Sequence, residues 1–567
     1  MRTTRASAAT LSLAVVAAAC AVLAASPAVA ANSTLTVDAA RPFRPVSHVG
    51  AGGLYALAEN NRPSDAMLLP LKLHTLTQPA PGVGQRPNGQ PPGGDSLLVA
   101  PQATRVGAAE YIRMPDIYPD FPYRWVSWTD WLSKVDAQVT ARLAATGTSN
   151  IAGWELWNEP DYTWNTAAAG NFNDAWVRTY RQVRARDPLT PIVGPSTAVY
   201  NEAWMRSFLT HARDSNTLPD IICWHELEGA HRVANDIANY RALEASLGIS
   251  PRRISINEYA TPTEIDQPGP VAGYIAKFER GGVDNAHRAF WYEYGTVNGL
   301  TVNNQPTGSW WLYKWYGDMA GNMVTTTPRA QTGLDGFAAH DPTRRIVRVI
   351  FGGESGTNHV RVTGLPSLGG SVRVLVESTP AAGRYTHVAA PTVISNSTAT
   401  VSNGELTVTV PNMNATSGYH IVIQPTSGVP SYQQRYEAEN ASIFRANRFG
   451  SAGASAGAYV GQIDNTGDPR TASYVDFVVN VPTARAYTMR IAYANATGAT
   501  ATHGLAYNGG AWSTVSYPPT GGWGQFGATV STTVNLRAGY NVIRLAKGAP
   551  YFAGGTGYAE LDYIELT

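Results

Sequence analysis

The sequence predicts a multidomain chain: a (β/α)8 TIM barrel with an accessory antiparallel β-sandwich, followed by a second β-rich domain. Between Val46 and Gly295, short apolar runs alternate with amphipathic stretches, which is typical of repeated βα units and a parallel sheet. After Thr325 the apolar residues recur at every second position, which is typical of antiparallel strands. A segment rich in Pro, Ser and Gly, Gln424–Pro430, then breaks the pattern, so we expect a linker before the last domain.

Residues 1–30 predict a signal peptide, and we therefore expect a secreted, extracellular bacterial protein. A basic start, Met1–Arg5, precedes the apolar run Ala9–Ala25 and a small-residue cleavage motif, Ala28–Ala30. The apolar run is shorter than the roughly 20 residues that cross a membrane. The scarcity of Lys beside abundant Arg favours a GC-rich bacterial genome. After cleavage Cys223 is the only cysteine, which excludes an internal disulfide.

The charge balance argues against several classes of partner. The formal net charge is +1 at pH 7 over 567 residues, and 15% of the residues are charged. A chain that binds nucleic acid or an anionic membrane surface normally carries a basic excess. We therefore expect neither of these partners, and we expect a monomer.

Eight candidate strands fill residues 46–325, the expected catalytic domain. Trp128–Leu143 is predicted to form a helix between two of these strands, because its apolar residues lie on one face. In such barrels the chemistry lies at the carboxyl ends of the strands. The candidate strands are Val46–Gly52, Leu68–Thr77, Ala108–Arg113, Ile151–Trp157, Pro191–Gly194, Asp220–His225, Arg253–Glu258 and Ala286–Tyr292.

The remaining residues divide into three expected segments. Residues 326–424 form the accessory β-sandwich, as runs such as Ser371–Val376 indicate, and the early segment Ser33–Asp38 could add a strand to it. Residues 425–434 form the linker. Residues 435–567 form the second β-rich domain.

Two glutamates stand at predicted strand ends. Glu159 follows Ile151–Trp157, and Pro160 stops that strand at once; Glu258 ends Arg253–Glu258. Residues at the ends of different barrel strands face one site even when they are distant in sequence. Two carboxyl groups about 5 Å apart, one protonated and one ionised, are what cleavage of a glycosidic bond with retention requires. The pair therefore predicts a retaining glycoside hydrolase.

The segment Trp157-Asn158-Glu159-Pro160 at the fourth strand, with a Glu at the seventh, resembles the large clan of (β/α)8 retaining glycosidases. Within that clan the chain is most similar to glycoside hydrolase family 39, whose activities include β-xylosidase, α-L-iduronidase and arabinose-releasing enzymes. The resemblance implies that Glu159 is the general acid/base, Glu258 the nucleophile and Asn158 a donor to the sugar 2-hydroxyl. The charge of Glu258 should raise the pKa of Glu159.

Several neighbouring residues leave alternatives open. Glu155 could face the barrel interior as a structural partner, and Glu293 is the rival candidate for the nucleophile. His225 ends the sixth strand, where we expect it either to contact the substrate or to support the catalytic residues. The alternative is that it has only a structural role. The clan commonly has a Tyr two residues after this His, bonded to the nucleophile, but here Leu227 stands there. Tyr292 and Tyr259 are the candidates to take the place of that tyrosine.

Aromatic rings and one arginine complete the candidate substrate site. Sugars stack their C–H faces on aromatic rings, although most large aromatic residues belong to cores. We expect substrate contacts from Trp291, Tyr292 and Trp164. Arg113 and Asp116 end another strand, where sugar binding and salt bridging at the barrel mouth are equally good interpretations. The remaining candidate rings are Trp154, Trp157, Trp224, Trp310 and Trp311.

The last domain opens on Tyr436–Glu439 and closes on Leu561–Glu565, and it resembles the family 35 and family 6 carbohydrate-binding modules. The resemblance implies a jelly-roll β-sandwich with a structural Ca²⁺ held by Glu437, Glu439 and Asp562, since carboxylates are suitable ligands for this ion. The alternative is that these are solvated strand-end acids. The module residues expected to contact sugar are Trp523, Tyr459 and Asn541.

The sequence thus predicts a secreted retaining glycoside hydrolase that acts by double displacement on a polysaccharide substrate, with arabinose-, xylose- or galactose-containing glycans favoured. No cofactor is expected for catalysis, and Ca²⁺ is expected only in the C-terminal module. Two alternatives remain open: a non-catalytic polysaccharide-binding protein and a transglycosylase. Replacement of Glu258 would distinguish the enzyme from the binding protein.

Overall fold

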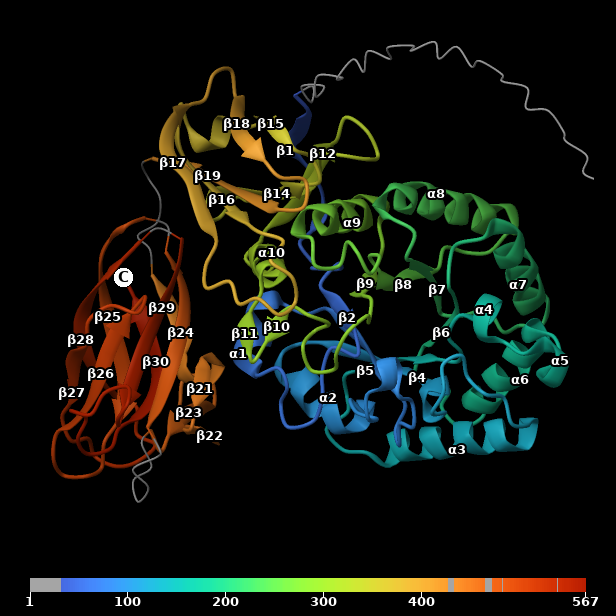
Figure 1. The fold of residues 1–567 in the computed structure, drawn as a ribbon, viewed down its shortest axis with the longest axis horizontal. Coiled ribbons are helices and arrows are strands. Elements are labelled where there is room, and N and C mark those ends of the chain that lie inside the picture. Colours follow the sequence, from blue (N-terminus) through green and yellow to red (C-terminus); the bar gives the residue numbers. More distant parts are fainter. Residues whose placement is uncertain (1–31, 427–432, 464–471, 482, 538) are drawn as a thin grey trace, which may run out of the picture.

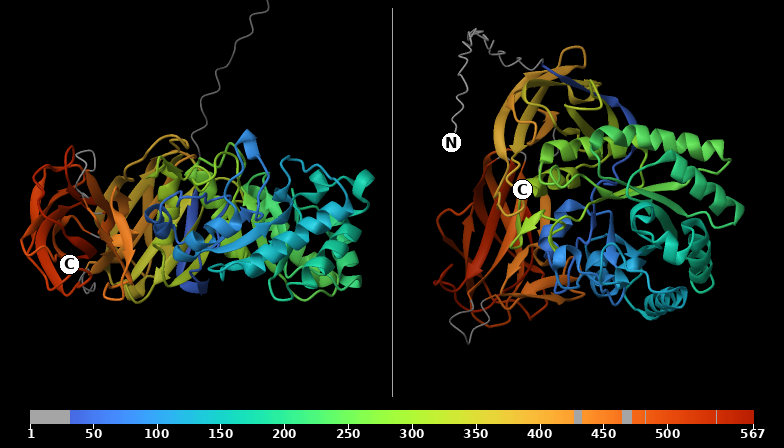
Figure 2. Two further views of the ribbon diagram at one scale, coloured as in Figure 1. Left: turned by 90° about the horizontal axis from the view of Figure 1, so that it is seen from below. Right: turned by 45° about the vertical axis from the view of Figure 1, so that its right-hand side comes forward.

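The computed structural model describes residues 32–426, 433–463, 472–481, 483–537 and 539–567 (Figure 1). The predicted signal peptide and most of the predicted linker lie outside these residues. In the described part of the chain, no helix is long and apolar enough to cross a membrane. Along the longest axis, the C-terminal domain lies at one end and the outer helices of the barrel at the other (Figure 2).

The predicted barrel is confirmed as a closed ring of eight parallel strands. Each strand is largely buried, because helices cover its outer face and the other strands cover its inner face. The strands, in the order of the ring, are β2 (Gly52–Leu54), β3 (Thr75–Pro79), β4 (Ala109–Arg113), β5 (Ile151–Glu155), β6 (Ile192–Thr197), β7 (Ile221–Glu226), β8 (Arg253–Tyr259) and β9 (Asn285–Arg288).

The helices of the barrel carry ordinary start signals. Ser127, the N-cap of α3 (Trp128–Ala144), accepts from the backbone N–H of Asp130, and this helix matches its predicted range. The other α-helices are α1 (Asp65–Leu68), α2 (Ser96–Arg105), α4 (Pro160–Thr163), α5 (Thr166–Ala169), α6 (Phe172–Arg184), α7 (Glu202–Asp214), α8 (Ala230–Ser246), α9 (Pro268–Gly281) and α10 (Gly308–Gly317). Short 3-10 turns are Leu69–Leu71, Pro87–Gly89 and Met114–Ile117, and a small hairpin joins β10 (Thr301–Val302) to β11 (Gln305–Pro306).

The first two barrel strands begin later in the sequence than predicted, at Gly52 and Thr75 rather than at Val46 and Leu68. The first begins at Gly52, where a Cβ would lie 2.5 Å from the carbonyl oxygens of Thr75 and Ala286. This close approach of neighbouring strands requires glycine, and a strand this short has no apolar run to reveal it. The apolar residues Leu68–Leu71 belong to helical turns because Pro70 occupies the start of a 3-10 helix.

The segment after the barrel forms one nine-stranded sheet with its own apolar core. Strand β1 (Thr34–Pro45) joins this sheet, pairing antiparallel with β12 and parallel with β15, so the sheet is mixed rather than purely antiparallel. The other strands are β12 (Asn322–Thr327), β13 (Asp335–Asp341), β14 (Ile346–Gly352), β15 (Gly356–Thr363), β16 (Ser371–Thr379), β17 (Thr392–Thr400), β18 (Leu406–Met413) and β19 (Gly418–Pro425).

The C-terminal domain contains a six-stranded and a five-stranded sheet that share one apolar core. The first sheet contains β20 (Gln434–Glu437), β22 (Asn447–Gly450), β23 (Ala458–Gly461), β25 (Arg485–Ala494), β28 (Ala528–Leu536) and β30 (Glu560–Leu566). The second contains β21 (Ser442–Phe444), β24 (Ser473–Val481), β26 (Ala501–Tyr507), β27 (Ser513–Tyr517) and β29 (Gly539–Lys547). This arrangement is a β-sandwich.

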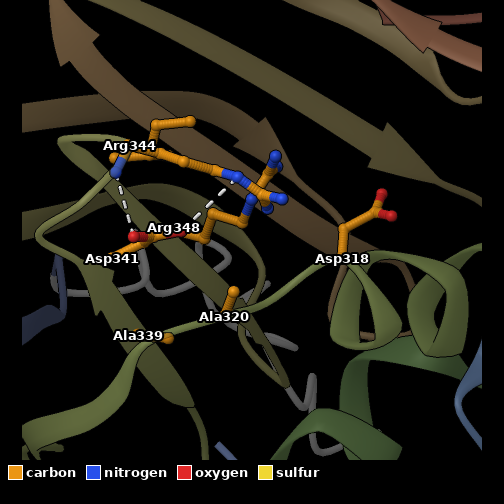
Figure 3. A pocket seen from close by; sticks show the side chains of 7 residues that line it. Asp318, Ala320, Ala339, Asp341, Arg344 and Arg348 are labelled. Atoms are coloured by element: carbon orange, nitrogen blue, oxygen red, sulfur yellow. Dashed lines mark hydrogen bonds and ion pairs between the residues drawn. The ribbon is translucent and has the colours of Figure 1, made fainter. Parts of the chain in front are cut away.

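The C-terminal domain docks on α10 through Tyr540. Its ring lies 4.6 Å from the ring of Trp311, and its hydroxyl donates to Asp318. Asn480 donates to the same carboxylate at 3.3 Å. Asp318 also lines a pocket of about 10 Å³, near the size of one water molecule, together with Arg348 of β14 and Arg344 of the turn between β13 and β14 (Figure 3). The three folded parts therefore meet around Asp318.

One buried carboxyl group in the barrel wall makes stability depend on pH. Glu110 on β4 is fully buried, and neither of its carboxyl oxygens has a hydrogen-bond partner among the described residues. Burial, assisted by the charge of Asp95, raises its pKa well above the ordinary value. The folded protein therefore keeps Glu110 protonated, whereas the unfolded chain ionises it near pH ~4.3. Stability is lost as the pH rises above that unfolded value, since the folded state binds more protons.

We expect Glu110→Gln, which keeps the shape of the protonated acid, to increase the free energy of unfolding at pH 7 by about 1–4 kcal/mol. Near pH 4 the variant and the original chain should be equally stable. Urea unfolding at both pH values measures this difference. The exposed residue Glu293, changed to Gln, is the control and should alter stability at neither pH. An equal gain for Glu110→Gln at both pH values would contradict the account.

Candidate active site

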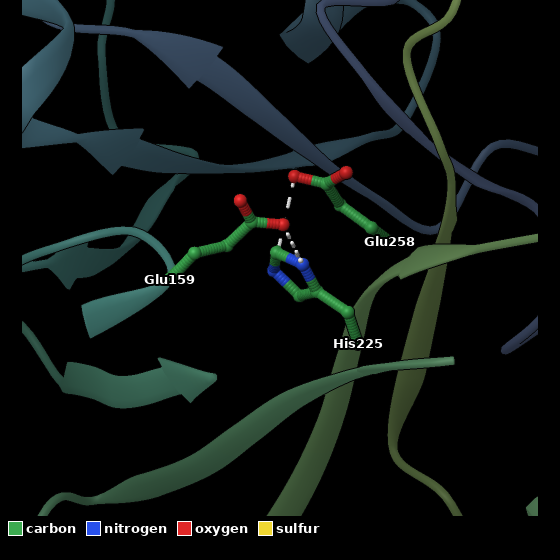
Figure 4. Close-up of side chains that lie close together, drawn as sticks. All are labelled: Glu159, His225 and Glu258. Carbon is green, nitrogen blue, oxygen red and sulfur yellow. Dashed lines mark hydrogen bonds and ion pairs between the residues drawn. The ribbon is translucent and has the colours of Figure 1, made fainter. Parts of the chain in front are cut away.

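Three side chains from three barrel strands meet at the carboxyl end of the barrel (Figure 4). Glu159 follows β5, His225 lies on β7 and Glu258 lies on β8. Their nearest ligating atoms all lie within 4.8 Å of one another. Both carboxylates are largely buried, with side chains only 10% and 8% exposed. The structure thus brings the two sequence-predicted carboxylates together.

Glu159 has a left-handed backbone, with φ 51° and ψ 54°. This region is sparsely populated by residues other than glycine, and such residues cluster at functional sites. The neighbouring chain fixes the conformation: the Glu159 N–H donates to the carbonyl of Ser196 at 2.8 Å, and the Glu159 carbonyl accepts from Thr163 at 2.6 Å. The turn directs the carboxyl group to His225.

Arg113 is the direct partner of Glu258. Its guanidinium, 1% exposed, donates through Nη1 to Glu258 Oε1 at 2.7 Å and through Nε to Glu155 Oε2 at 2.9 Å. Asn257 in turn donates to the other oxygen of Glu155 at 2.6 Å. Glu155 therefore faces the barrel interior, where it balances the charge of Arg113 and orients its side chain.

Neither Tyr259 nor Tyr292, the two candidates to replace the clan's usual tyrosine, bonds to Glu258. The Tyr259 hydroxyl donates to the carbonyl of Gly50 at 2.8 Å, and the Tyr292 hydroxyl donates to Asp266 at 3.0 Å. Both hydroxyls are therefore bonded elsewhere, and Arg113 occupies the place they would have taken. Of the two interpretations of Arg113, the structure favours a salt bridge, with the nucleophile candidate itself as the partner.

His225 lies between the two carboxylates. Its Nδ1 is 3.1 Å from Glu159 Oε1, and its Nε2 is 3.7 Å from Glu258 Oε1. Burial alone would lower its pKa, but the charge of Glu258 and the hydrogen bond to Glu159 outweigh burial and raise it. The protonated ring then donates from Nδ1 to Glu159. His225 is thus a link between the two acids, and no surface of it is left for a sugar.

The pKa of Glu159 differs from the sequence-based expectation. Burial alone would raise it, but the hydrogen bond and charge of His225 outweigh burial and lower it. Burial raises the pKa of Glu258 against the opposing charges of His225 and Arg113. The expectation considered only the repulsion between the two carboxylates and omitted the histidine between them. In the free site, the proton of the Glu159–His225 pair therefore lies on His225.

Asn158, next to Glu159, is 3% exposed, and its Oδ1 has no hydrogen-bond partner among the described residues.

Trp164 and Trp291 are half-buried; their indole N–H groups donate to the backbone of Gly170 and Ala260. The other five candidate tryptophans are buried in the core. Asp116 is buried too, where it accepts from the hydroxyls of Tyr55 and Tyr123 rather than from Arg113.

Glu293, the rival nucleophile, has an exposed side chain and is absent from the carboxylate cluster. The loop from Gln78 to Gly94 lies against this part of the barrel: Asn88 donates to the carbonyl of Trp291 at 2.9 Å. This loop therefore borders the aromatic residues that follow β9, Phe290 to Tyr294.

Two of the three acids predicted to bind Ca²⁺, Glu437 and Asp562, accept hydrogen bonds from Ser455 in the C-terminal domain. The Ser455 N–H donates to Asp562 at 2.9 Å, and its hydroxyl donates to Glu437. Glu439 is 3% exposed, and its Oε2 has no hydrogen-bond partner among the described residues. Burial and the neighbouring Glu437 raise the pKa of Glu439 to about 7. The unpartnered oxygen of Glu439 is the kind of hard ligand that Ca²⁺ prefers, but among the described residues the three acids are not close enough to one another to form a group that could share a metal ion.

The predicted sugar-contacting residues of this domain have different surroundings. Trp523 is 49% exposed. Tyr459 is half-buried and stacks on Phe449 at 5.4 Å. Asn541 is 1% exposed and its side-chain amide donates to the carbonyl of Arg537, so it supports a turn rather than a binding surface.

Sequence reasoning missed Asn257 as the residue that supports Glu155, and it missed the aromatic residues Phe121 and Tyr162 near Glu159. Phe121 is 48% exposed and Tyr162 is 64% exposed, and their ring centroids lie 6.2 Å apart. The available signal was position, because Phe121 stands in the segment that follows β4, and Tyr162 lies on α4, directly after β5.

No family model matches the chain, but comparisons with curated proteins and with solved structures find proteins similar to it. The chain is 27% identical to a 3-O-alpha-D-galactosyl-alpha-L-arabinofuranosidase of Bifidobacterium longum subsp. longum and 26% identical to a 3-O-beta-L-arabinopyranosyl-alpha-L-arabinofuranosidase of Bifidobacterium pseudocatenulatum, each over 70% of this chain. These alignments cover 41% and 48% of the two relatives, less than half of their length. The solved structure of N2152 from Neocallimastix frontalis is 36% identical, with a TM-score of 0.67, over 70% of this chain and 100% of that one.

Proposed function

This chain belongs to the same family as N2152 from Neocallimastix frontalis, and we propose that it is a retaining glycoside hydrolase that cleaves α-L-arabinofuranosyl bonds in arabinose-containing glycans. The observation that carries the proposal is the pair Glu159 and Glu258, whose nearest oxygens lie within 4.8 Å at the carboxyl end of the barrel. Retaining enzymes hold their two carboxyl groups about 5 Å apart, whereas inverting enzymes leave a gap of roughly 6.5–9.5 Å for a water molecule.

In the first step, Glu258 attacks the anomeric carbon, and the bond from that carbon to the glycosidic oxygen breaks. Arg113 opposes the effect of burial by favouring the ionised form of Glu258, and it fixes the orientation of the carboxylate. Glu159 protonates the departing oxygen, having received that proton from His225 across their 3.1 Å hydrogen bond. Loss of the carboxylate charge on Glu258, when its bond to the sugar forms, lowers the pKa of His225 and Glu159 together.

In the second step, Glu159 takes a proton from water as the water oxygen attacks the anomeric carbon. The bond between that carbon and Glu258 breaks, and the sugar leaves with its original configuration. Asn158, whose buried Oδ1 is unpartnered among the described residues, lies beside Glu159 and is proposed to bond the sugar hydroxyl next to the anomeric carbon. Trp291 and Trp164 are proposed to border the same sugar.

The substrate class rests on the two bifidobacterial relatives, whose names both specify an α-L-arabinofuranosyl bond. A test is the release of sugar from arabinan, arabinogalactan and xylan, with products separated by chromatography. Arabinose, or an arabinose-containing disaccharide, should be released from the first two substrates. Release of no sugar from any of them would favour a polysaccharide-binding protein, and longer products would favour a transglycosylase.

Secretion, a monomeric state and a carbohydrate-binding role for the C-terminal domain are parts of the same proposal. Trp523 and Tyr459 are its proposed sugar contacts, and Glu437, Glu439 and Asp562 would hold Ca²⁺ there. We also keep the assignment to glycoside hydrolase family 39 as a proposal, supported by the Asn158-Glu159 pair after the fourth barrel strand and Glu258 on the seventh.

We expect Ca²⁺ to raise the midpoint of thermal unfolding of the C-terminal domain and EDTA to lower it, because bound cation stabilises only the folded site. At a free Ca²⁺ concentration 100 times the Kd, the gain is about 2.7 kcal/mol. Differential scanning calorimetry of the full chain measures it. Asp562→Asn should remove the response. Glu560→Gln, a neighbouring acid outside the proposed ligand set, should preserve it. An unchanged midpoint in both buffers would contradict the site.

A further inference from the structure

We propose that Phe121 and Tyr162 form a binding surface for the sugar units on the leaving-group side of the scissile bond. The inference rests on the proposed function and adds to it the part of the substrate that is not transferred to Glu258. Both rings are exposed, at 48% and 64%, and their centroids lie 6.2 Å apart. The ring planes are tilted by 52° to each other, so each ring offers its own exposed apolar face, and sugar C–H faces stack on such faces.

The position of Tyr162 places this surface beside the acid/base. Tyr162 lies on α4, and its N–H donates to the carbonyl of Glu159 at 2.9 Å. Its Cα is therefore within one helical turn of the residue that protonates the departing oxygen. The sugar attached to that oxygen must lie on the Glu159 side, whereas the transferred sugar lies over Glu258.

Phe121 is joined to the same site by a chain of buried rings. It contacts Tyr123 at 5.6 Å, and Tyr123 contacts Trp157 at 5.3 Å, directly before Asn158 in sequence. Tyr123 is held in turn by its hydrogen bond to Asp116 at 2.9 Å. The exposed ring of Phe121 thus stands on a rigid, buried support, as a preorganised sugar contact requires.

The strand order separates this surface from the nucleophile. Phe121 and Tyr162 follow the adjacent strands β4 and β5, while Glu258 lies on β8, three strands further round the ring. A glycan that crosses the site from β8 to β5 would place its transferred end near Glu258 and its remaining units over the two rings. The enzyme is therefore expected to favour substrates in which the arabinofuranosyl group is attached to a longer chain.

Two substrates with the same transferred sugar test the inference. α-L-Arabinofuranosyl fluoride has a leaving group of one atom, whereas an arabino-oligosaccharide presents several sugar units to the leaving-group side. We expect Tyr162→Ala and Phe121→Ala each to lower kcat/KM on the oligosaccharide about fivefold, and the double variant more, with kcat/KM on the fluoride unchanged. Tyr162→Phe should retain the activity on both substrates.

Leu189 is the matched control, because it is 88% exposed and lies in the loop before β6, at the opposite face of the barrel. Leu189→Ala should leave both substrates unaffected. Equal losses on the fluoride and the oligosaccharide, or no loss on either, would overturn the inference while leaving the proposed function intact. An original chain that hydrolyses neither substrate would overturn the proposed function and this inference together.

Discussion

Replacement of Glu258 by Ala is expected to lower kcat on an aryl α-L-arabinofuranoside by about 10⁴-fold or more, because the variant has no group to form the covalent intermediate. Arg113, the partner of the removed carboxylate, still has Glu155 as an ion-pair partner, so no buried charge is left uncompensated. The loss therefore reports chemistry rather than unfolding. Initial rates at saturating substrate measure it.

Azide provides the second arm of this experiment. In Glu258→Ala a small anion can occupy the space of the lost carboxylate, attack the anomeric carbon from that side and expel the aryl oxide. The product should be the β-L-arabinofuranosyl azide, of inverted configuration. Glu293→Ala, which removes the exposed rival carboxylate, is the control and should retain the original activity. Near-normal activity of Glu258→Ala would contradict its assignment.

Glu159→Ala is expected to have an effect that depends on the leaving group. For a sugar leaving group, which needs a proton to depart, kcat/KM should fall by about 10²–10⁴-fold, the usual contribution of general acid catalysis. For a 2,4-dinitrophenyl leaving group, kcat/KM should stay close to the original value because dinitrophenolate departs without a proton. Steady-state kinetics on both substrates separates the two cases.

With Glu159→Ala, azide should attack the glycosyl-enzyme on the face that water would use. The product is then the α-L-arabinofuranosyl azide, with the configuration of the substrate. Glu228→Ala removes a half-exposed carboxylate that follows β7, the strand that carries His225, and is the matched control. An equal loss of kcat/KM for both leaving groups would show that Glu159 is not the acid.

The barrel and its two carboxylates could be predicted because both depend on local signals. Strands β5, β6, β7 and β8 contain short apolar runs, and a Glu at the end of such a run must lie at the rim of the barrel. The start at Gly52 could not be predicted, since a close contact between β2 and its neighbours, rather than an apolar run, determines it. The break at Leu68–Leu71 depends in the same way on Pro70.

The electrostatics of the site could not be predicted from sequence. Arg113 reaches Glu258 across the interior of the closed barrel, 145 residues away in sequence, and no spacing rule reports such a contact. The pKa of Glu159 was expected to be raised, and it is lowered because the ring of His225 lies between the two acids. Both features depend on which side chains meet inside the ring of strands.

Trapping of the covalent intermediate tests the central claim most directly. A 2-deoxy-2-fluoro-α-L-arabinofuranosyl donor with an activated leaving group slows the second step more than the first, so the glycosyl-enzyme should accumulate. Peptide mapping by mass spectrometry should find a single sugar on the peptide that contains Ile256, Asn257 and Glu258, attached to Glu258. A sugar attached to Glu159 or Glu293, or turnover with no adduct and an inverted product, would contradict the account.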